Sequence, residues 1–300
     1  MRKVILGLGI FLILLVTVCT FFKDDIVYLV DTNITKMLYE KQEGNDYTID
    51  ATFDYIKPYS GLELRDRNDI LPSIFYSMNL GVDETNKYCA KDYANCYAEV
   101  GDIANKSEIL SLLNNFVHPY NTFEKITISG DNDIIKLQFQ HLYTDDEIEA
   151  INEVVDKVIN EKITNNMPTR EKIKVIHDYI IDNADYDTLK TDNINDTTYK
   201  SNTAYGVLIQ GYGICSGYAD AMAIFLDKLD IINYRISNDK HIWNLVYLDG
   251  EWYHLDLTWD DPVTDINTNR DTYFLIDTET LKLINDGTHY FDYSIFSEAE

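Results

Sequence analysis

The segment 241–259, HIWNLVYLDGEWYHLDLTW, constrains the fold most, because it predicts a β-hairpin whose register is fixed. Asp249 and Gly250 lie between two alternating runs, and glycine tolerates the positive φ that a two-residue turn requires. Such a turn places Leu248 opposite Glu251. Successive side chains of a strand point to opposite faces of its sheet. One face is therefore expected to carry His241, Trp243, Leu245, Tyr247, Trp252, His254, Asp256 and Thr258.

The same register brings a histidine close to an aspartate. It places Trp243 opposite Asp256. His241 then lies opposite Thr258 and becomes a diagonal neighbour of Asp256, with roughly 7–8 Å between the two backbones. An imidazole and a carboxylate can close that gap with a hydrogen bond, whereas a slip of one residue would put them on opposite faces. The carboxylate would orient the ring and stabilise its protonated form, which leaves the other ring nitrogen for a third group.

The sequence GYGICSGYADAMAIF, residues 211–225, places Cys215 where a glycine-rich loop becomes a helix. This helix is expected to run to about Leu229. Its buried stripe, headed by Cys215, comprises Ala219, Met222, Leu226 and Leu229. At the first turn, unpaired backbone N–H groups and the positive end of the helix dipole favour a thiolate over a thiol. By its position alone, Cys215 fits a packed thiol as well as a nucleophile.

Taken together, Cys215, His241 and Asp256 favour a catalytic interpretation. If the helix packs on the face that carries His241, the thiol meets the free ring nitrogen. The three side chains then supply a nucleophile, a general base and a group that orients the base. Taken singly, a histidine on a strand is usually structural and an aspartate often ends a strand. His254 is expected to be structural, and the three tryptophans are expected to shield the site or fill the core.

Two further helices are expected before the cysteine helix. The sequence TDDE predicts a capping box, with Thr144 as the N-cap and Glu147 at the third helical position. The second helix is expected to begin near Pro168 and Thr169. His177 lies beside the apolar stripe of this second helix, and we expect it to be a hydrogen-bonded core or surface residue.

Residues 24–143 contain no catalytic constellation and are expected to form an accessory N-terminal domain of mixed α and β structure. Their clearest element is a hairpin around Gly130. Cys89 and Cys96 flank a short loop and could close a disulfide in an oxidising compartment. The alternative is two free, partly buried thiols. With the disulfide closed, Cys215 is the odd cysteine, as a reactive thiol would be.

The uncharged run VILGLGIFLILLVTVCTFF near the N-terminus determines the expected location. At about 19 residues it can just span a bilayer as a helix, and no small-residue cleavage site follows it. We expect residues 1–23 to be an uncleaved membrane anchor, with Arg2 and Lys3 in the cytoplasm and the C-terminal domain outside the cell. The alternatives are a cleaved signal, which would release a secreted protein, and a lipoprotein-type signal that uses Cys19.

The net charge limits the partners. The chain carries 51 acidic residues against 25 basic ones, which gives a formal charge of −26 at pH 7. This excess would repel the phosphates of nucleic acid and an anionic lipid surface. We therefore expect no nucleic-acid partner, and contact with a membrane only through the N-terminal segment.

Three segments of the chain resemble the transglutaminase-like superfamily in its bacterial, surface-associated form. They are GYGICSGYADAMAIFL, HIWNLVYLDGEWYHLDLTWDDP and YFLIDTETL. The motifs are Cys-x-Gly-Tyr, His-x-Trp-Asn and Trp-Tyr-x-x-Asp-x-Thr-Trp, and the resemblance covers about residues 165–285. It implies a papain-like α+β fold, in which a central helix presents a cysteine to an antiparallel sheet. It also implies that the catalytic triad of the family corresponds to Cys215, His241 and Asp256. We assign residues 144–300 to this domain.

The chemistry that the resemblance implies is acyl transfer from a protein or peptide amide, through a cysteine thioester. A lysine acceptor gives cross-linking and water gives deamidation or proteolysis, so a cysteine peptidase or amidase is the close alternative. A noncatalytic surface module with the same fold is the alternative outside catalysis. The substrate could be associated with the cell wall, and no cofactor or metal site is expected.

The oxyanion of such a reaction needs two hydrogen-bond donors. The backbone N–H of Cys215 is one candidate. Gln210 is a candidate for the second, as a glutamine is in papain-like enzymes, and Tyr212 is comparably plausible. Animal transglutaminases use a tryptophan before the cysteine, and no tryptophan stands in that stretch here.

Overall fold

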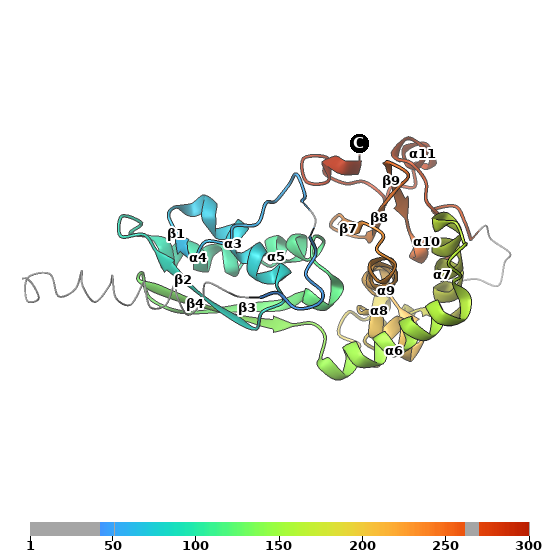
Figure 1. Cartoon of the computed structure of the whole chain (residues 1–300), viewed down its shortest axis with the longest axis horizontal. Helices are drawn as coiled ribbons and strands as arrows, with labels where there is room; N and C mark the ends of the chain where they lie inside the picture. The colour runs from blue at the N-terminus through green and yellow to red at the C-terminus, as the bar shows by residue number, and fades with distance from the viewer. Residues whose placement is uncertain (1–42, 51, 262–269, 300) are drawn as a thin grey trace, which may run out of the picture. The chain divides into compact units, whose positions relative to one another are not determined.

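The computed structural model describes residues 43–50, 52–261 and 270–299 (Figure 1). The helices of these ranges are α3 (Arg67–Asn79), α4 (Cys96–Ala104), α5 (Ser107–Asn114), α6 (Asp145–Lys162), α7 (Thr169–Asn183), α8 (Thr188–Asp192), α9 (Cys215–Lys228), α10 (Leu257–Asp260) and α11 (Thr278–Ile284). Shorter helical segments are η1 (Pro119–Asn121), η2 (Gly206–Gln210) and η3 (Ser297–Ala299). The strands are β1 (Glu63–Leu64), β2 (Glu84–Cys89), β3 (Phe123–Gly130), β4 (Ile134–His141), β5 (Asp185–Tyr186), β6 (Tyr212–Gly213), β7 (Asn233–Ser237), β8 (Ile242–Leu248) and β9 (Glu251–Leu255).

The chain from Gly44 to Glu300 groups into one compact unit. One apolar cluster includes Phe116 from before the predicted boundary at residues 143 and 144, and Trp243 from after it. The division into domains 24–143 and 144–300 stays a prediction from sequence. The expected membrane anchor at residues 1–23 lies outside the described residues, and no helix within those residues is long and apolar enough to cross a bilayer.

A four-stranded sheet in the order β1-β2-β4-β3 lies in the N-terminal half of the described chain. Strands β3 and β4 form the hairpin that the sequence predicts around Gly130, whose φ is +115°. The carboxylate of Asp131 accepts the N–H groups of Asp133 (2.8 Å) and Ile134 (3.1 Å) and thereby stabilises the turn. Because α4 and α5 both contact β3, this part of the chain is mixed α and β.

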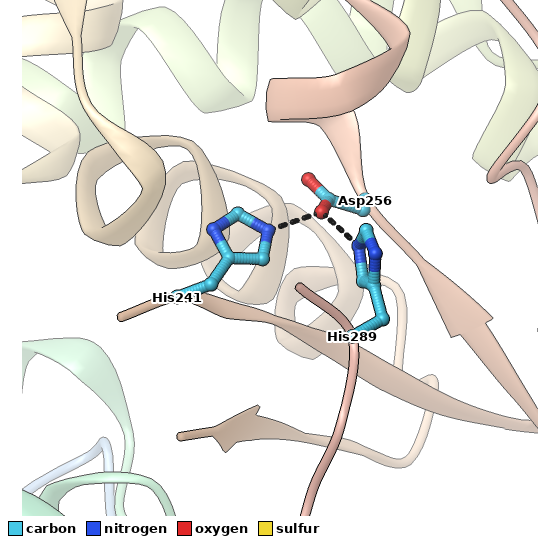
Figure 2. A group of neighbouring side chains, drawn as sticks. All are labelled: His241, Asp256 and His289. Atoms are coloured by element: carbon cyan, nitrogen blue, oxygen red, sulfur yellow. Dashed lines mark hydrogen bonds and ion pairs between the residues drawn. The ribbon is translucent and has the colours of Figure 1, made fainter. Parts of the chain in front are cut away.

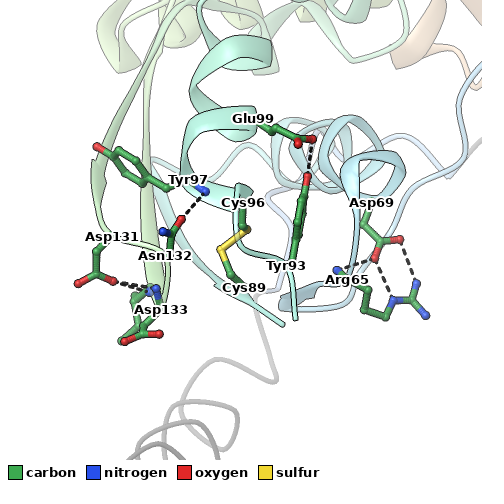
Figure 3. The surroundings of a disulfide bond; sticks show 11 residues. Arg65, Asp69, Cys89, Tyr93, Cys96, Tyr97, Glu99, Asp131, Asn132 and Asp133 are labelled. Atoms are coloured by element: carbon green, nitrogen blue, oxygen red, sulfur yellow. Dashed lines mark hydrogen bonds and ion pairs between the residues drawn. A yellow bond between two sulfur atoms is a disulfide. The ribbon is translucent and has the colours of Figure 1, made fainter. Parts of the chain in front are cut away.

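A disulfide joins Cys89, the last residue of β2, to Cys96, the first residue of α4 (Figure 3). The two Cα atoms are 5.9 Å apart. Beside the bridge, the N–H of Tyr97 donates to Oδ1 of Asn132 at 3.1 Å, which holds the first turn of α4 to the β3–β4 turn. Of the two alternatives that the sequence left open for these cysteines, the structure has the disulfide, and Cys215 is the free cysteine of the described chain.

Strands β7, β8 and β9 form a three-stranded antiparallel sheet with β8 in the centre. The predicted register of the β8–β9 hairpin is confirmed, since Leu248 pairs with Glu251 and Tyr247 with Trp252. The turn residue Gly250 has a φ of +95°, which glycine adopts without strain. This sheet is the antiparallel sheet that the resemblance implied.

The far end of the hairpin differs from the prediction. Strand β9 ends at Leu255, and Asp256 caps α10 instead of continuing the ladder. Its Oδ1 accepts the N–H of Thr258 at 2.8 Å and that of the next residue at 3.3 Å. The predicted strand pairing of Trp243 with Asp256 is therefore wrong. The pairing of His241 with Thr258 is wrong as well, because a carboxylate that accepts the N–H groups of the next turn starts a helix.

Helix α9 is buried on nearly all sides. Its residues from Gly217 to Leu226 are all buried, whereas the sequence predicted a single buried stripe. The helix contacts α7, α10, β7 and β8. The side chain of Asn244 in β8 donates to the carbonyl oxygen of Ala219 at 2.9 Å. A Cβ atom at Gly217 would lie 2.3 Å from the carbonyl oxygen of Ser201, so only glycine fits there.

Helices α6 and α7 begin where the sequence predicts. Oγ1 of Thr144 accepts the N–H of Glu147 (3.4 Å), and the carboxylate of Glu147 accepts the N–H of Thr144 (3.1 Å), which confirms the capping box. In α7, the ring of His177 is fully buried. Its Nδ1 lies 3.0 Å from Asp178 and its Nε2 lies 3.2 Å from Asp260. His177 is therefore a hydrogen-bonded core residue.

A buried ion pair holds α9 to β7. Arg235 of β7 pairs with Asp220 of α9, and each side chain is only 4% exposed. The guanidinium of Arg235 also donates to the carbonyl oxygen of Val117 at 2.8 Å. The hydroxyl of Tyr143 donates to the second oxygen of Asp220 at 2.6 Å. Together these contacts fix α9, and therefore its first residue, relative to the sheet.

Candidate active site

Cys215 is the first residue of α9 and is partly exposed. The chain reaches it through η2, a single π-helical turn that ends at a glycine with a φ of +78°. Before the cysteine, the N–H of Ile214 donates to the carbonyl oxygen of Ser201 at 2.8 Å. After it, Oγ of Ser216 donates to the carbonyl oxygen of Asn202 at 3.1 Å. Both neighbours of Cys215 are thus anchored, and its sulfur lies at the N–H end of a helix.

His241 and Asp256 meet although they are not strand partners (Figure 2). His241 immediately precedes β8 and Asp256 immediately follows β9, so both lie at the end of the hairpin away from its turn. Nε2 of His241 forms a short hydrogen bond with Oδ2 of Asp256. Cys215 lies close enough to the ring to raise the pKa of His241. Because Nε2 is engaged by Asp256, Nδ1 is the nitrogen left for the sulfur.

The charges of these groups hold His241 protonated and Asp256 ionised. Burial alone would lower the pKa of His241, but the negative charge of Asp256 and hydrogen bonds with Asp256 and Cys215 raise it from 6.5 to about 10. Burial alone would raise the pKa of Asp256, but His241 and a second histidine hold it well below its usual 3.8. The site therefore places an imidazolium between a carboxylate and a sulfur.

The raised pKa of His241 leads to a testable pH dependence of stability. Between pH 6.5 and about 10, folded His241 keeps a proton that the unfolded chain has lost. Its stabilisation is therefore complete below pH 6.5 and is lost as the pH rises through about 10. We expect the Tm of wild type to exceed that of His241→Gln by several degrees near pH 6.5. The difference should vanish above about pH 10.

The variant His254→Gln is the control for this measurement. Burial lowers the pKa of His254 to about 3, so its stabilisation is present above pH 6.5 and is lost only as the pH falls toward that value. The Tm difference between wild type and His254→Gln should stay constant over the alkaline range. A constant difference for His241→Gln as well would contradict an imidazolium at position 241.

Aromatic side chains surround the ring of His241. Trp243 is 1% exposed and stacks on this ring, with the centroids 5.5 Å apart. Its Nε1 donates to Nδ1 of His254 at 3.0 Å, and Nε2 of His254 bonds Oγ1 of Thr278 at 3.0 Å, so His254 is structural as predicted. Trp259 is 44% exposed and turns its edge toward His241. Trp243 therefore fills the core behind the ring, and Trp259 shields it on the solvent side.

His289 is the residue that sequence reasoning missed (Figure 2). Its Nε2 lies 2.7 Å from Oδ2 of Asp256, the oxygen that His241 also contacts. Its Nδ1 lies 2.7 Å from Oδ2 of Asp286. The only signal in the sequence is the Asp-x-x-His spacing of DGTH, which indicates a local turn. That spacing does not relate His289 to an aspartate 33 positions earlier.

The predicted oxyanion donors lie in the segment that leads into α9. Gln210 ends η2, and its side-chain oxygen accepts the N–H of Lys200 at 2.7 Å, which ties it to the preceding loop. Tyr212 lies in β6, and its ring stacks on that of Tyr199 with 4.0 Å between the centroids. The oxyanion role of either side chain stays a prediction, as does that of the backbone N–H of Cys215.

Two groups of described side chains could hold a metal ion by distance alone. In the first, the ligand atoms of His241, Asp256 and His289 lie within 4.8 Å of one another. Both histidines already form hydrogen bonds with the same carboxylate oxygen. An ion at this site would have to replace those two hydrogen bonds. In the second group, a lysine ammonium lies between the carboxylates of Asp178 and Asp271, at 2.5 and 2.9 Å. A cation would have to displace it.

Comparisons with known proteins found one family model that matches part of the chain. Residues 156–257 match the model of the transglutaminase-like superfamily. A solved structure of a TGase is 16% identical over 49% of this chain and 45% of its own, with a TM-score of 0.35. A candidate cysteine protease from Cytophaga hutchinsonii is 14% identical over 43% of this chain and 55% of its own, with a TM-score of 0.28. The chain thus spans about half the length of each structure. No curated protein matches the chain.

Proposed function

We propose, from the match of residues 156–257 to the model of the transglutaminase-like superfamily, that the chain is a cysteine acyltransferase that acts on protein or peptide amides. The observation that carries the proposal is the short hydrogen bond between His241 and Asp256, next to a cysteine that helps to raise the pKa of this histidine. A thiol at a helix N-terminus, a protonated ring and a buried carboxylate are the parts that thioester chemistry requires.

The first half-reaction is the acylation of Cys215. Its thiolate attacks the carbonyl carbon of a glutamine side chain or a peptide bond, and an S–C bond forms as the carbonyl oxygen takes up charge. When this intermediate collapses, the C–N bond breaks and Nδ1 of His241 gives its proton to the leaving amine. The negative charge of the sulfur is lost in the thioester. One cause of the raised pKa of His241 disappears with that charge, so the proton leaves more easily as the reaction advances.

The second half-reaction needs an acceptor. Neutral His241 takes a proton from an attacking amine or water, the C–S bond breaks, and the thiolate–imidazolium pair of Cys215 and His241 is restored. Asp256 stays ionised throughout and keeps the ring oriented. We propose an amine as the acceptor. Hydrolysis, as by a cysteine peptidase or amidase, is the second candidate, favoured by the partial exposure of Cys215, which admits water.

We also propose that the reaction takes place outside the cytoplasm, with the chain held to the cell membrane by its N-terminal segment. The disulfide between Cys89 and Cys96 supports an oxidising compartment. The uncharged run that follows Lys3 is long enough to span a bilayer. The substrate is then a protein or peptide of the cell surface or wall. Cleavage of the segment would make the protein secreted instead.

Incubation of the full chain with a glutamine-containing protein and a labelled primary amine tests the acyl acceptor. We expect the wild-type chain to incorporate the label. The variant His241→Ala should do so about 10² to 10⁴ times more slowly, because it lacks the general acid and base. Cleaved fragments or released ammonia without incorporated label would contradict the amine acceptor and support the hydrolase. A wild-type chain that does neither would favour a noncatalytic binding module with the same fold.

A further inference from the structure

We propose that His289 and Asp286 extend the catalytic chain, so that His289 fixes the carboxylate of Asp256 and stabilises its charge. This role of a positioning residue rests on the proposed function, because His289 acts on the reaction through Asp256. Figure 2 shows the two histidines on either side of this carboxylate.

Both oxygens of Asp256 are engaged. Oδ1 accepts the N–H of Thr258 at 2.8 Å and that of Trp259 at 3.3 Å. Oδ2 bonds Nε2 of His241 and, at 2.7 Å, Nε2 of His289. The carboxylate therefore cannot turn without losing contacts on both oxygens. Without His289, Oδ2 would be held by the catalytic ring alone.

The His289 ring has three polar contacts. Nε2 lies 2.7 Å from Oδ2 of Asp256, and Nδ1 lies 2.7 Å from Oδ2 of Asp286 and 3.2 Å from Oγ1 of Thr288. A carboxylate oxygen only accepts hydrogen bonds, so the contact with Asp256 places an N–H at Nε2. Burial would raise the pKa of Asp286, but hydrogen bonds from Thr288, Tyr273 and His289 hold it well below its usual 3.8. The ionised Asp286 thus lies beside Nδ1 and helps to keep Nε2 of the ring turned toward Asp256.

The surroundings fix this ring in place. Its side chain is 2% exposed. It stacks on Tyr273 with 4.6 Å between the centroids, and it meets Trp243 edge to face at 4.9 Å. The titratable groups that face it are Asp256, Asp286, His241, His254 and Tyr273.

Asn238 couples the positions of the two histidines. Its Nδ2 donates to the carbonyl oxygens of Thr288 and Tyr290, at 2.7 Å each, and so holds the loop that carries His289. Its Oδ1 accepts the backbone N–H of His241 at 2.9 Å. Asn238 therefore holds the backbone beside both His241 and His289. The rings of these two histidines contact the same carboxylate oxygen of Asp256.

The extended chain runs in the order Asp286, His289, Asp256, His241 and Cys215. Loss of His289 would leave Asp256 with a single histidine and with Asp286 as a nearby like charge. His289 is also one of the groups that hold the pKa of Asp256 low. Without it, Asp256 takes up a proton at a higher pH and releases His241. The acid limb of the pH–activity profile, where activity falls with falling pH, should therefore move to a higher pH.

The experiment compares the full chain with His289→Gln, His289→Ala and His254→Gln. Alkylation of Cys215 by iodoacetamide and incorporation of a labelled amine are measured from about pH 2.5 to about pH 9, so that the range extends below the usual pKa of an aspartate. Glutamine keeps an N–H donor, and alanine removes it. His254 is also buried but bonds Trp243 and Thr278, so His254→Gln controls for lost packing.

We expect His289→Ala to slow both reactions about 10- to 100-fold near neutral pH, as the loss of a hydrogen bond to a charged group does. His289→Gln should slow them less. Both should move the acid limb upward by about one pH unit, whereas His254→Gln should leave it in place. If His289→Ala fails to fold, His289→Gln carries the comparison by itself.

Two results would overturn the role of His289. One is an acid limb that stays at the wild-type position in the His289 variants. The other is an equal movement of this limb in His254→Gln, which would trace the effect to packing. Failure of the proposed function looks different, because the wild-type chain would then incorporate no amine and its Cys215 would be alkylated no faster than a free thiol. In that case both proposals fall.

Discussion

Replacing Cys215 with alanine is expected to lower kcat/KM for acyl transfer by about 10⁴-fold or more. The sulfur is the atom that forms the thioester, and the remaining histidine and aspartate have no nucleophile to activate. Initial rates of amine incorporation by the full chain measure the effect. The loss should fall on kcat, because substrate binding does not require the sulfur.

The neighbouring Ser216 offers a matched control. Its Oγ donates to the carbonyl oxygen of Asn202 at 3.1 Å and takes no part in the triad, so Ser216→Ala should keep most of the activity. Both variants should keep a Tm close to that of wild type, since Cys215 and Ser216 are only partly buried. Turnover by Cys215→Ala above about a tenth of the wild-type rate would exclude this cysteine as the nucleophile.

Replacing Asp220 with alanine is expected to lower the free energy of unfolding by about 3–5 kcal/mol, because it leaves a buried guanidinium without its counter-charge. Arg235 is 4% exposed on its side chain and cannot reach water without moving β7. The hydroxyl of Tyr143 would lose its acceptor as well. Urea unfolding of the full chain measures the change, and activity should fall in parallel as α9 loosens.

The exposed pair of Asp102 and Arg67 is the control for this prediction. Its nitrogen and oxygen are 2.7 Å apart, yet both side chains are 48% exposed. Water and salt replace such a contact readily, so Asp102→Ala should shift the urea midpoint little. If Asp220→Ala shifted the midpoint no more than Asp102→Ala, the buried pair would not be what holds α9 to β7.

The local elements could be read from the sequence because each depends on residues that are close along the chain. The two-residue turn at Asp249 and Gly250 set the register of β8 and β9, as observed. The capping box at Thr144 set the start of α6. The disulfide between Cys89 and Cys96 closes over a separation of only seven residues.

The prediction was less accurate where a side chain could satisfy the backbone in two ways. Asp256 was expected to stand on a strand opposite Trp243, and it caps α10 instead. Asp256 lies near His241 in either arrangement. The predicted contact between the two side chains was therefore correct, although the predicted strand was too long. Helix α9 was likewise expected to have one buried stripe, but elements distant in sequence cover its other sides.

The amino-acid sequence alone determined the helix that begins at Cys215, the hairpin that carries His241, and the acidic character of the chain, because these follow from spacing and charge along the chain. Only the tertiary structure decided that His289 shares an oxygen of Asp256 with His241, and that Arg235 reaches Asp220. Such contacts depend on the path of the loops between distant elements. Loop paths follow from the packing of the whole core, which no local pattern specifies.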